Sequence, residues 1–310
     1  GSSRYIQQLV DDADVIHLIG HWSVLNSLVY RAIRKAGKPY VICPAGALAI
    51  FGRSKFIKQI YNAVSGNQII NNASKWIAVT PEERRYFFSA GASADKVVVI
   101  PNGIAESDFK SSDVDGFRRK HSLESRRFIL FVGRLNLIKG PDLLLRAFCN
   151  IKDRHQNIDL VFVGPDGGLQ TELKNLVQLH GAGSRVHFVG YLGGVDKSDA
   201  YHAAEMLVIP SRHEAMSIVA LEAGVCGTPV LLTDKCGFNQ LEETGCGWVV
   251  PATVEGLEQG LDMALSNPER IGYAASNIKK YVTELYSWDV VVQSYKNMYS
   301  QLNMGSSGKN

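Results

Sequence analysis

Short apolar runs rich in β-branched residues alternate with longer segments of helical periodicity along most of this 310-residue chain. In the second half, runs of strand length lie at residues 128–132, 160–163, 186–189, 206–209 and 229–232. Helical patterns lie between them at 142–151, 169–180 and 217–225. Such alternation is typical of βαβ units, whose strands lie parallel in one sheet. The pattern predicts an α/β fold with a complete doubly wound domain over residues 124–286.

The first 123 residues show the same alternation with fewer strands. Runs of strand length lie at 15–19, 40–43, 75–79 and 96–100. A helix is predicted over 23–36, with Gly37 directly after its end. Thr80-Pro81-Glu82-Glu83 is a capping box with proline at the first helical position, and it predicts another helix start. We expect residues 1–123 to form an incomplete domain whose opening βα units are missing, with 105–127 as a polar linker and one short helix.

Composition excludes several classes of protein. The formal net charge of +3 is too small to indicate nucleic acid binding, and no basic tract is interleaved with aromatic residues. The five cysteines include no CxxC pair, so neither a disulfide framework nor a zinc site is indicated. The apolar runs are far shorter than the roughly 20 residues that span a bilayer. We interpret the start, Gly1-Ser2-Ser3, as a tag remnant or the edge of a fragment.

The segment 52–61 has a basic face and an apolar face. Amphipathic segments of this kind either pack on a core or lie on a membrane surface. We interpret this one as core packing and keep peripheral membrane contact as the alternative.

Two glutamates, Glu214 and Glu222, are separated by seven residues and follow the predicted strand 206–209. The residues between them would start a helix at the carboxyl end of a parallel sheet, where ligands of such sheets bind. Free N–H groups and the helix dipole favour an anion there, such as a diphosphate. Glu214 can point at a sugar, and Glu222 can accept hydrogen bonds from vicinal hydroxyls. The spacing alone also fits two unrelated surface glutamates.

Two cations, Arg134 and Lys139, lie in the loop after the predicted strand 128–132. Cations beside a helix start are what a departing nucleoside diphosphate requires as negative charge develops on it. An arginine and a lysine in a loop are usually just solvated. Together with the two glutamates, however, they point to one site at one edge of the sheet.

The ordered combination of these segments resembles the retaining glycosyltransferases of family 4, which have the GT-B fold. The matching segments of the second half are Phe131-Val132-Gly133-Arg134-Leu135 with Lys139-Gly140, then 161–164, 186–191, Pro210-Ser211, Glu214 with Glu222-Ala223, and 227–230. Segments 76–80, 100–104 and Ser287-Trp288-Asp289 match as well, so the resemblance covers nearly the whole chain. It implies two Rossmann-like domains facing a cleft, with a helix over about 287–302 packing back on the first.

The resemblance also implies roles for the matching residues. Arg134 and Lys139 would hold the donor phosphates, Glu214 the sugar hydroxyls and Glu222 the ribose. The remaining donor-binding residues would be Gly133, the backbone N–H groups of Met216, Ser217 and Ile218 at the diphosphate, and Gly164, Tyr191 and Leu192 by the nucleobase.

The chain departs from the family pattern in its first half. The glycine-rich loop after the family's first strand is absent. Many members carry His-x-His at the strand aligned with 17–19, and the second histidine, which faces the donor sugar, is Ile19 here. His21, two residues further on, is a candidate catalytic substitute. The family's Pro-His-Gly reads Pro44-Ala45-Gly46.

We expect no metal ion. In the other glycosyltransferase fold, the metal-binding Asp-x-Asp string follows an apolar strand. Neither of the two such strings here does, Asp12-Ala13-Asp14 or Asp113-Val114-Asp115. His17 and His21 have i,i+4 spacing, which brings side chains together on a helix but not on a strand.

These observations favour metal-independent, retaining transfer of a sugar from a UDP-, GDP- or ADP-sugar. The acceptor, a glycan, a lipid-linked or a small-molecule compound, would bind to the first domain. The resemblance implies front-face substitution, and a location in the cytoplasm or at the cytoplasmic face of the membrane. Two alternatives stay open: an isomerase such as a UDP-sugar 2-epimerase, and a nucleotide-sugar-binding lobe without catalysis.

Overall fold

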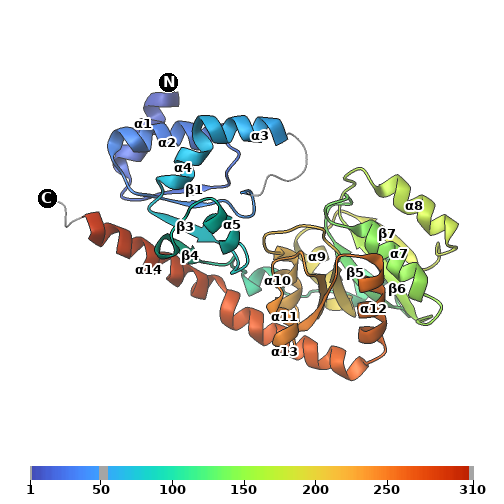
Figure 1. Cartoon of the computed structure of the whole chain (residues 1–310). Coiled ribbons are helices and arrows are strands. Elements are labelled where there is room, and N and C mark those ends of the chain that lie inside the picture. Colours follow the sequence, from blue (N-terminus) through green and yellow to red (C-terminus); the bar gives the residue numbers. More distant parts are fainter. Residues whose placement is uncertain (1, 49–54, 307–310) are drawn as a thin grey trace. The chain divides into compact units, whose positions relative to one another are not determined.

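The computed structural model describes residues 2–48 and 55–306. They form two compact units, Gly1–Asn102 with Asp289–Asn310, and Gly103–Trp288 (Figure 1). Each unit is built around a sheet whose strands all run parallel. The predicted α/β class with two parallel-sheet domains is therefore confirmed.

The first unit has a four-stranded sheet in the order β1-β2-β3-β4. Its strands are β1 (Ile16–Ile19), β2 (Tyr40–Cys43), β3 (Lys75–Ala78) and β4 (Val97–Val99). Its helices are α1 (Ser2–Asp12), α2 (Val24–Ala36), α3 (Lys55–Tyr61), α4 (Asn67–Asn71), α5 (Arg84–Ser89) and α14 (Trp288–Ser306). A π-helical turn, η1 (Asn62–Gly66), joins α3 to α4, and a 3₁₀ turn, η2 (Ala94–Lys96), precedes β4.

The helix α2 shows how local sequence sets these boundaries. The hydroxyl of Ser23 accepts a hydrogen bond from the N–H of Asn26, which satisfies a donor of the first turn. Gly37 has φ +67°, and its N–H donates to the carbonyl of Ile33, which closes the helix. The predicted helix at 23–36 is confirmed.

The helix α14 packs within the first unit. Nδ1 of His17 on β1 lies 2.8 Å from the hydroxyl of Tyr299. The His17 ring also contacts the ring of Tyr295, with 5.8 Å between centroids. Burial lowers the pKa of His17, so its imidazole is neutral at pH 7.

The second unit has a six-stranded sheet in the order β10-β9-β8-β5-β6-β7. Its strands are β5 (Arg127–Val132), β6 (Ile158–Val163), β7 (Val186–Gly190), β8 (Met206–Ile209), β9 (Val230–Thr233) and β10 (Gly247–Val250). Its helices are α6 (Val114–Lys120), α7 (Pro141–Ile151), α8 (Gln170–Leu179), α9 (Gly194–Ala203), α10 (Ile218–Val225), α11 (Gln240–Glu243), α12 (Val254–Leu265) and α13 (Pro268–Tyr286), with a 3₁₀ turn, η3 (Glu106–Phe109). The chain leaves β5 toward β6 and β7 on one side and later adds β8, β9 and β10 on the other.

The boundary between the two units lies after Asn102, whereas the sequence predicted it after residue 123. The structure assigns Gly103 onward to the second unit. The carboxylate of Asp199 on α9 accepts hydrogen bonds from the Ser111 hydroxyl and from the N–H groups of Ser112 and Asp113. The buried Asp199 carboxylate thus helps to hold a polar segment without periodicity, a contact that hydrophobic patterning does not reveal.

The capping box at Thr80 forms only in part. The hydroxyl of Thr80 accepts from the N–H of Glu83 at 3.3 Å. The Glu83 carboxylate, however, accepts from the N–H groups of Val79 and Gly46 and so braces the loop after β2. The α-helix consequently begins at Arg84, one turn later than predicted.

The amphipathic segment predicted at 52–61 lies partly outside the described residues, because the description resumes at Lys55. In α3, Phe56 is 73% and Ile57 66% exposed. The expected core packing is wrong for these two side chains, since the described residues leave this face of the helix uncovered. None of the described helices combines the length and the apolar composition needed to cross a bilayer.

Candidate functional site

The carboxyl ends of β5 and β8 are neighbours where the strand order of the second sheet reverses. β5 pairs with β8 through Ile129–Met206 and Leu130–Leu207. In open α/β sheets, ligands bind outside the carboxyl ends of the strands at such a point. Both motifs singled out in the sequence belong to loops at this edge.

The loops after β5 and β8 are held against each other. The N–H of Arg212 donates to the carbonyl of Ile138 at 2.8 Å. The Arg212 guanidinium binds both carboxylate oxygens of Asp142, at 2.8 and 2.6 Å, in the first turn of α7. Gly140 has φ +70°, and a Cβ atom there would overlap the carbonyl oxygen of Pro210. These contacts fix the loop that carries Lys139 relative to the loop that carries Glu214.

Lys139 and Glu214 form an ion pair. Nζ of Lys139 lies 2.9 Å from Oε1 of Glu214, with side-chain exposures of 35% and 9%. The same carboxylate oxygen accepts a hydrogen bond from the hydroxyl of Ser211. The structure thus joins one residue from each motif, although they lie 75 positions apart in the chain.

The N-terminus of α10 presents free donors beside this pair. In the described part of the chain, no residue outside α10 accepts a hydrogen bond from the N–H groups of Met216, Ser217 and Ile218. Ser217 is completely buried, and its hydroxyl has no partner among the described residues. Unpaired donors at a helix start favour an anion, because the dipole adds to the N–H groups. This end of α10 can therefore receive phosphate oxygens.

Glu222, one turn into α10, is already hydrogen-bonded on both carboxylate oxygens. Tyr201 of α9 donates its hydroxyl to Oε2 at 2.6 Å, and Lys197 donates to Oε1 at 2.9 Å. Tyr201 is fully buried; burial first, and then the adjacent Glu222 carboxylate, raises the pKa of its phenol far above the usual value. The phenol is therefore a permanent donor that orients Glu222.

Two glycines, Gly133 and Gly164, directly follow β5 and β6 at this edge of the sheet. Gly164 has φ +140°, and a Cβ atom there would overlap the carbonyl oxygen of Gly133. The N–H of Gly133 donates to the carbonyl of Val163 at 2.9 Å. The two loops approach closely because Gly164 carries no side chain.

Arg134, Tyr191 and Leu192 lie at the same edge of the sheet. Arg134 is exposed, and its side chain lies over Gly167, whose added Cβ would come within 2.7 Å of the arginine Cγ. Tyr191 is exposed and Leu192 is buried, both directly after β7. Among the described residues, no hydrogen bond or ion pair joins Arg134 to the Lys139–Glu214 pair.

His21 belongs to the first unit and is 3% exposed. Its Nε2 lies 2.8 Å from Oδ1 of Asn62, and its ring meets the rings of Trp22 and Tyr61 at steep angles. Burial lowers its pKa, although the hydrogen bond to Asn62 acts in the opposite direction. Ile19, at the position of the family histidine, is exposed.

Sequence reasoning missed the residues that hold the candidate site in place. Lys197 and Tyr201 orient Glu222, Ser211 binds Glu214, and Arg212 joins the two loops. Lys197, Tyr201 and Arg212 act on partners 21 to 70 positions away, so no local spacing reveals them. Asp199 on α9, between Lys197 and Tyr201, shows the same limitation. Ser211 lies only three positions before Glu214, but this spacing carries no recognised motif.

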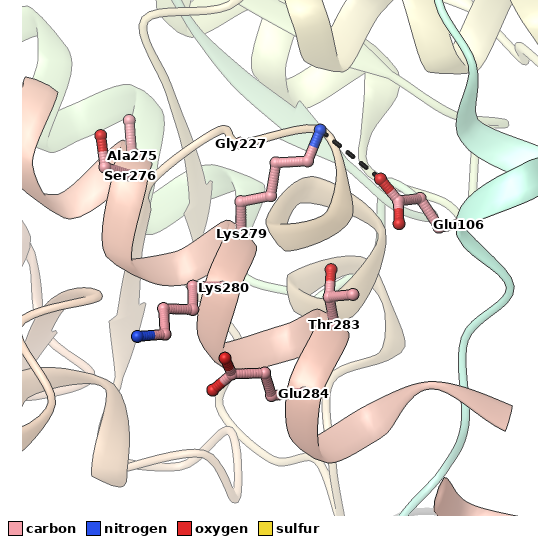
Figure 2. A pocket seen from close by; sticks show the side chains of 8 residues that line it. All are labelled: Glu106, Gly227, Ala275, Ser276, Lys279, Lys280, Thr283 and Glu284. Carbon is pink, nitrogen blue, oxygen red and sulfur yellow. Dashed lines mark ion pairs between the residues drawn. The ribbon is translucent and has the colours of Figure 1, made fainter. Parts of the chain in front are cut away.

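A separate hollow of about 610 Å³ lies beside α13. Figure 2 shows Lys279 of α13 paired across it with Glu106, at 3.5 Å. Gly227, which also lines it, precedes β9, so the hollow lies at the amino end of that strand. It is therefore distinct from the carboxyl edge that carries the candidate site. The described residues contain no group of three or more metal-ligating side chains.

Comparisons with known proteins identify the family of the chain. Residues 113–281 match the family model described as glycosyl transferases group 1, and residues 2–103 match one described as a glycosyl transferase 4-like domain. The first match alone covers more than half of the chain and includes every site residue of the second unit.

Curated relatives are similar to much of the chain. An uncharacterised glycosyltransferase of Methanocaldococcus jannaschii is 36% identical over 212 residues, 66% of this chain and 54% of that protein. The D-inositol 3-phosphate glycosyltransferase of Actinosynnema mirum is 29% identical over 259 residues, 77% of this chain and 60% of that protein. The chain thus spans less than two thirds of the length of both relatives.

The crystal structure of Anabaena HepE in complex with UDP has a TM-score of 0.84 at 22% identity, covering 96% of this chain and 82% of that one. At this identity the likeness shows a shared fold.

Proposed function

Because the chain belongs to the group 1 glycosyl transferases and has their GT-B fold, we propose that it transfers a sugar from a nucleotide sugar to an acceptor with retention of the anomeric configuration. The observation that carries the proposal is the Lys139–Glu214 ion pair beside the open N-terminus of α10. A cation, a carboxylate and free N–H groups there match the three parts of a sugar diphosphate.

The donor phosphates would bind between the loop after β5 and α10. The ammonium group of Lys139 has three N–H donors and uses one in the pair with Glu214, so it can also bind a phosphate oxygen. Arg134 would supply the second cation, and Met216, Ser217 and Ile218 the N–H groups. Preorganised positive groups stabilise the charge that develops on the departing nucleoside diphosphate.

The sugar and ribose would be held by the two glutamates. Glu214 would accept hydrogen bonds from the sugar hydroxyls while Lys139 and Ser211 hold its carboxylate. Glu222 would accept the ribose hydroxyls through its remaining lone pairs, since Tyr201 and Lys197 occupy one on each oxygen. Gly133, Gly164, Tyr191 and Leu192 would border the nucleobase.

The reaction would be a front-face substitution. The bond between the anomeric carbon and the phosphate oxygen breaks as the acceptor oxygen bonds to that carbon from the same face. The acceptor proton passes to an oxygen of the departing phosphate. Glu214 orients the sugar in this scheme and does not form a covalent bond.

The donor would be a UDP-, GDP- or ADP-sugar. The shared fold with a protein solved in complex with UDP favours UDP as the first to test. The acceptor, a glycan, a lipid-linked or a small-molecule compound, would bind to the first unit. The exposed Phe56 and Ile57 of α3 support peripheral contact with a membrane. The proposed location is the cytoplasm or the cytoplasmic face of the membrane.

Calorimetric titration with UDP, GDP and ADP, together with an assay of slow donor hydrolysis, tests the proposal. Lys139→Ala and Arg134→Ala should each slow hydrolysis more than about 100-fold, because a lost preorganised donor costs about 3 kcal/mol. Lys174→Ala on α8 is the matched control, since Lys174 is exposed and lies away from the site. Binding without hydrolysis would favour the non-catalytic lobe, and unchanged hydrolysis in both site variants would contradict the phosphate assignment.

Metal independence is a second test. The cations Arg134 and Lys139 would neutralise the diphosphate in place of a divalent ion. Donor hydrolysis should therefore survive incubation with EDTA. A complete loss that Mn²⁺ restores would contradict this part of the proposal.

A further inference from the structure

The first unit contains a cavity of about 410 Å³, within the roughly 300–1,000 Å³ usual for ligand sites. Its polar lining consists of His21, Asn62, Asn67, Asn71, Tyr86 and Ser89. Its apolar lining consists of Leu48, Ile70 and Ala90. The nine lining residues are thus three carboxamides, two hydroxyls and an imidazole around an apolar patch.

The three asparagines share one side because of the π-helical turn between α3 and α4. Asn67 and Asn71 are four residues apart on α4, so they lie on one face. Asn62 is five residues before Asn67, and in a regular α-helix this spacing would place the two side chains on different faces. The wider turn η1 brings it back, and such turns occur frequently at functional sites. Gly66 permits this, because a Cβ atom there would lie 2.5 Å from Oδ1 of Asn62.

The imidazole of His21 is held in one tautomer. Oδ1 of Asn62 can only accept, so Nε2 of His21 carries the proton and donates at 2.8 Å. The other nitrogen, Nδ1, is buried and has no partner among the described residues. An acceptor left unpaired in this way costs stability unless a bound group satisfies it.

Most of the other polar groups of the cavity are also available. No described residue hydrogen-bonds to the carboxamides of Asn67 and Asn71, and both side chains are exposed. The hydroxyl of Tyr86 accepts from Arg85 at 3.2 Å and keeps its proton free to donate. The cavity therefore offers several donors and several acceptors, all on uncharged groups.

We propose that this cavity binds a neutral polyhydroxylated ring, a sugar or a cyclitol. Each hydroxyl of such a ring both donates and accepts, as does each carboxamide of the cavity. The apolar patch of Leu48, Ile70 and Ala90 suits the C–H face of the ring. The assignment rests on the proposed function in one respect: it makes this ligand the acceptor of the transferred sugar.

A binding experiment that does not depend on catalysis tests the proposal. The probes are glucose and myo-inositol, with glucose 6-phosphate and myo-inositol 1-phosphate as their charged counterparts. Each is titrated into the full chain with and without saturating UDP, and binding is followed by saturation-transfer NMR and calorimetry. The double variant Asn67→Ala, Asn71→Ala removes two exposed carboxamides, and Gln68→Ala removes an exposed carboxamide outside the cavity lining.

We expect one neutral probe to bind and the double variant to bind it about tenfold more weakly, as expected for two lost neutral hydrogen bonds. Gln68→Ala should match the parent chain, and all variants should bind UDP equally. The proposal would be overturned if neither neutral probe bound, or if the double variant bound the probe as tightly as the parent chain. Tighter binding of the phosphorylated probes would overturn it as well. Loss of UDP binding by the parent chain would instead contradict the proposed function.

Discussion

Glu214 and Glu222 are held by different kinds of donor, and this difference bears on their roles. Glu214 is bonded by a half-exposed lysine and a serine hydroxyl, both of which can share their protons with a ligand. Glu222 is bonded by a fully buried phenol and by Lys197, so its carboxylate is fixed before any ligand arrives. A fixed carboxylate suits a ribose, whose position does not change during the reaction.

Glu214→Gln should therefore lower kcat chiefly and leave nucleoside diphosphate affinity unchanged. A carboxylate beside the anomeric carbon helps most when that carbon gains positive charge. Glu222→Gln should raise KM more than it lowers kcat, because ribose contacts are equal in ground state and transition state. Steady-state kinetics with calorimetric titration of UDP measures both effects. Loss of UDP binding in Glu214→Gln alone would reverse the two assignments.

Tyr201→Phe tests whether the buried phenol orients Glu222. It removes one hydrogen bond worth about 1 kcal/mol, so UDP affinity should fall roughly fivefold. Because Tyr201 is proposed to act only through Glu222, the double variant with Glu222→Gln should bind UDP no more weakly than Glu222→Gln alone. Additive losses would show that the phenol acts by another route.

Among the elements, the amino ends of β5, β6 and β7 are tied together by Asp159. Its carboxylate accepts hydrogen bonds from Arg126, Arg185 and His187 at 2.6 to 2.9 Å. Burial alone would raise the pKa of Asp159, but these donors outweigh burial and hold it below the usual value. The network lies at the opposite end of the strands from the candidate site, so its role is structural.

Asp159→Asn should destabilise the second unit by about 3 kcal/mol, because removing one partner leaves buried charges uncompensated. Urea unfolding followed by circular dichroism measures this. In the parent chain, the depressed pKa contributes stability that is complete above about 3.9, the value of an unfolded aspartate. That contribution is lost as the pH falls through the folded-state pKa. An acid-unfolding midpoint that is the same in parent and variant would contradict this account.

The strands β5, β6, β8 and β9 were predictable because largely buried parallel strands are continuous apolar runs. The edge strand β7 is only partly buried and was predicted from its valines and Phe188. β10 was not predicted, since a four-residue strand that begins with Gly247 has little of that pattern. The carboxamide cavity was also missed, because Asn62 is brought to it by the spacing of the π-helical turn, which differs from the α-helical period. Arg134, Lys139, Glu214 and Glu222 could be proposed from motifs, but their partners depend on contacts between distant segments.

Over the whole molecule, the two units should respond differently to mild acid. Burial lowers the pKa of His17 and His21 in the first unit, and that of His121 in the second. The unfolded chain, whose histidines titrate near 6.5, then binds protons first, so stability falls as the pH decreases below that value. Glu83 acts in the opposite direction, because burial raises its pKa.

Calorimetric melting at pH 7.5 and pH 5.5 should show a larger loss for the first unit than for the second. His17→Gln with His21→Gln should reduce that loss, which separates the histidines from Glu83. Equal shifts of both transitions in the parent chain would contradict the assignment.

The chain enters the second unit at Gly103 and leaves it after Trp288, so the second unit interrupts the first. Domains usually fold in the order in which the ribosome delivers them. Here the contiguous second unit can complete its sheet during synthesis, whereas β1 must wait for Tyr299 to emerge before His17 gains its partner. The unit that begins first is thus the last to be finished, and a nascent chain stalled before α14 would carry a folded second unit beside an unfinished first one.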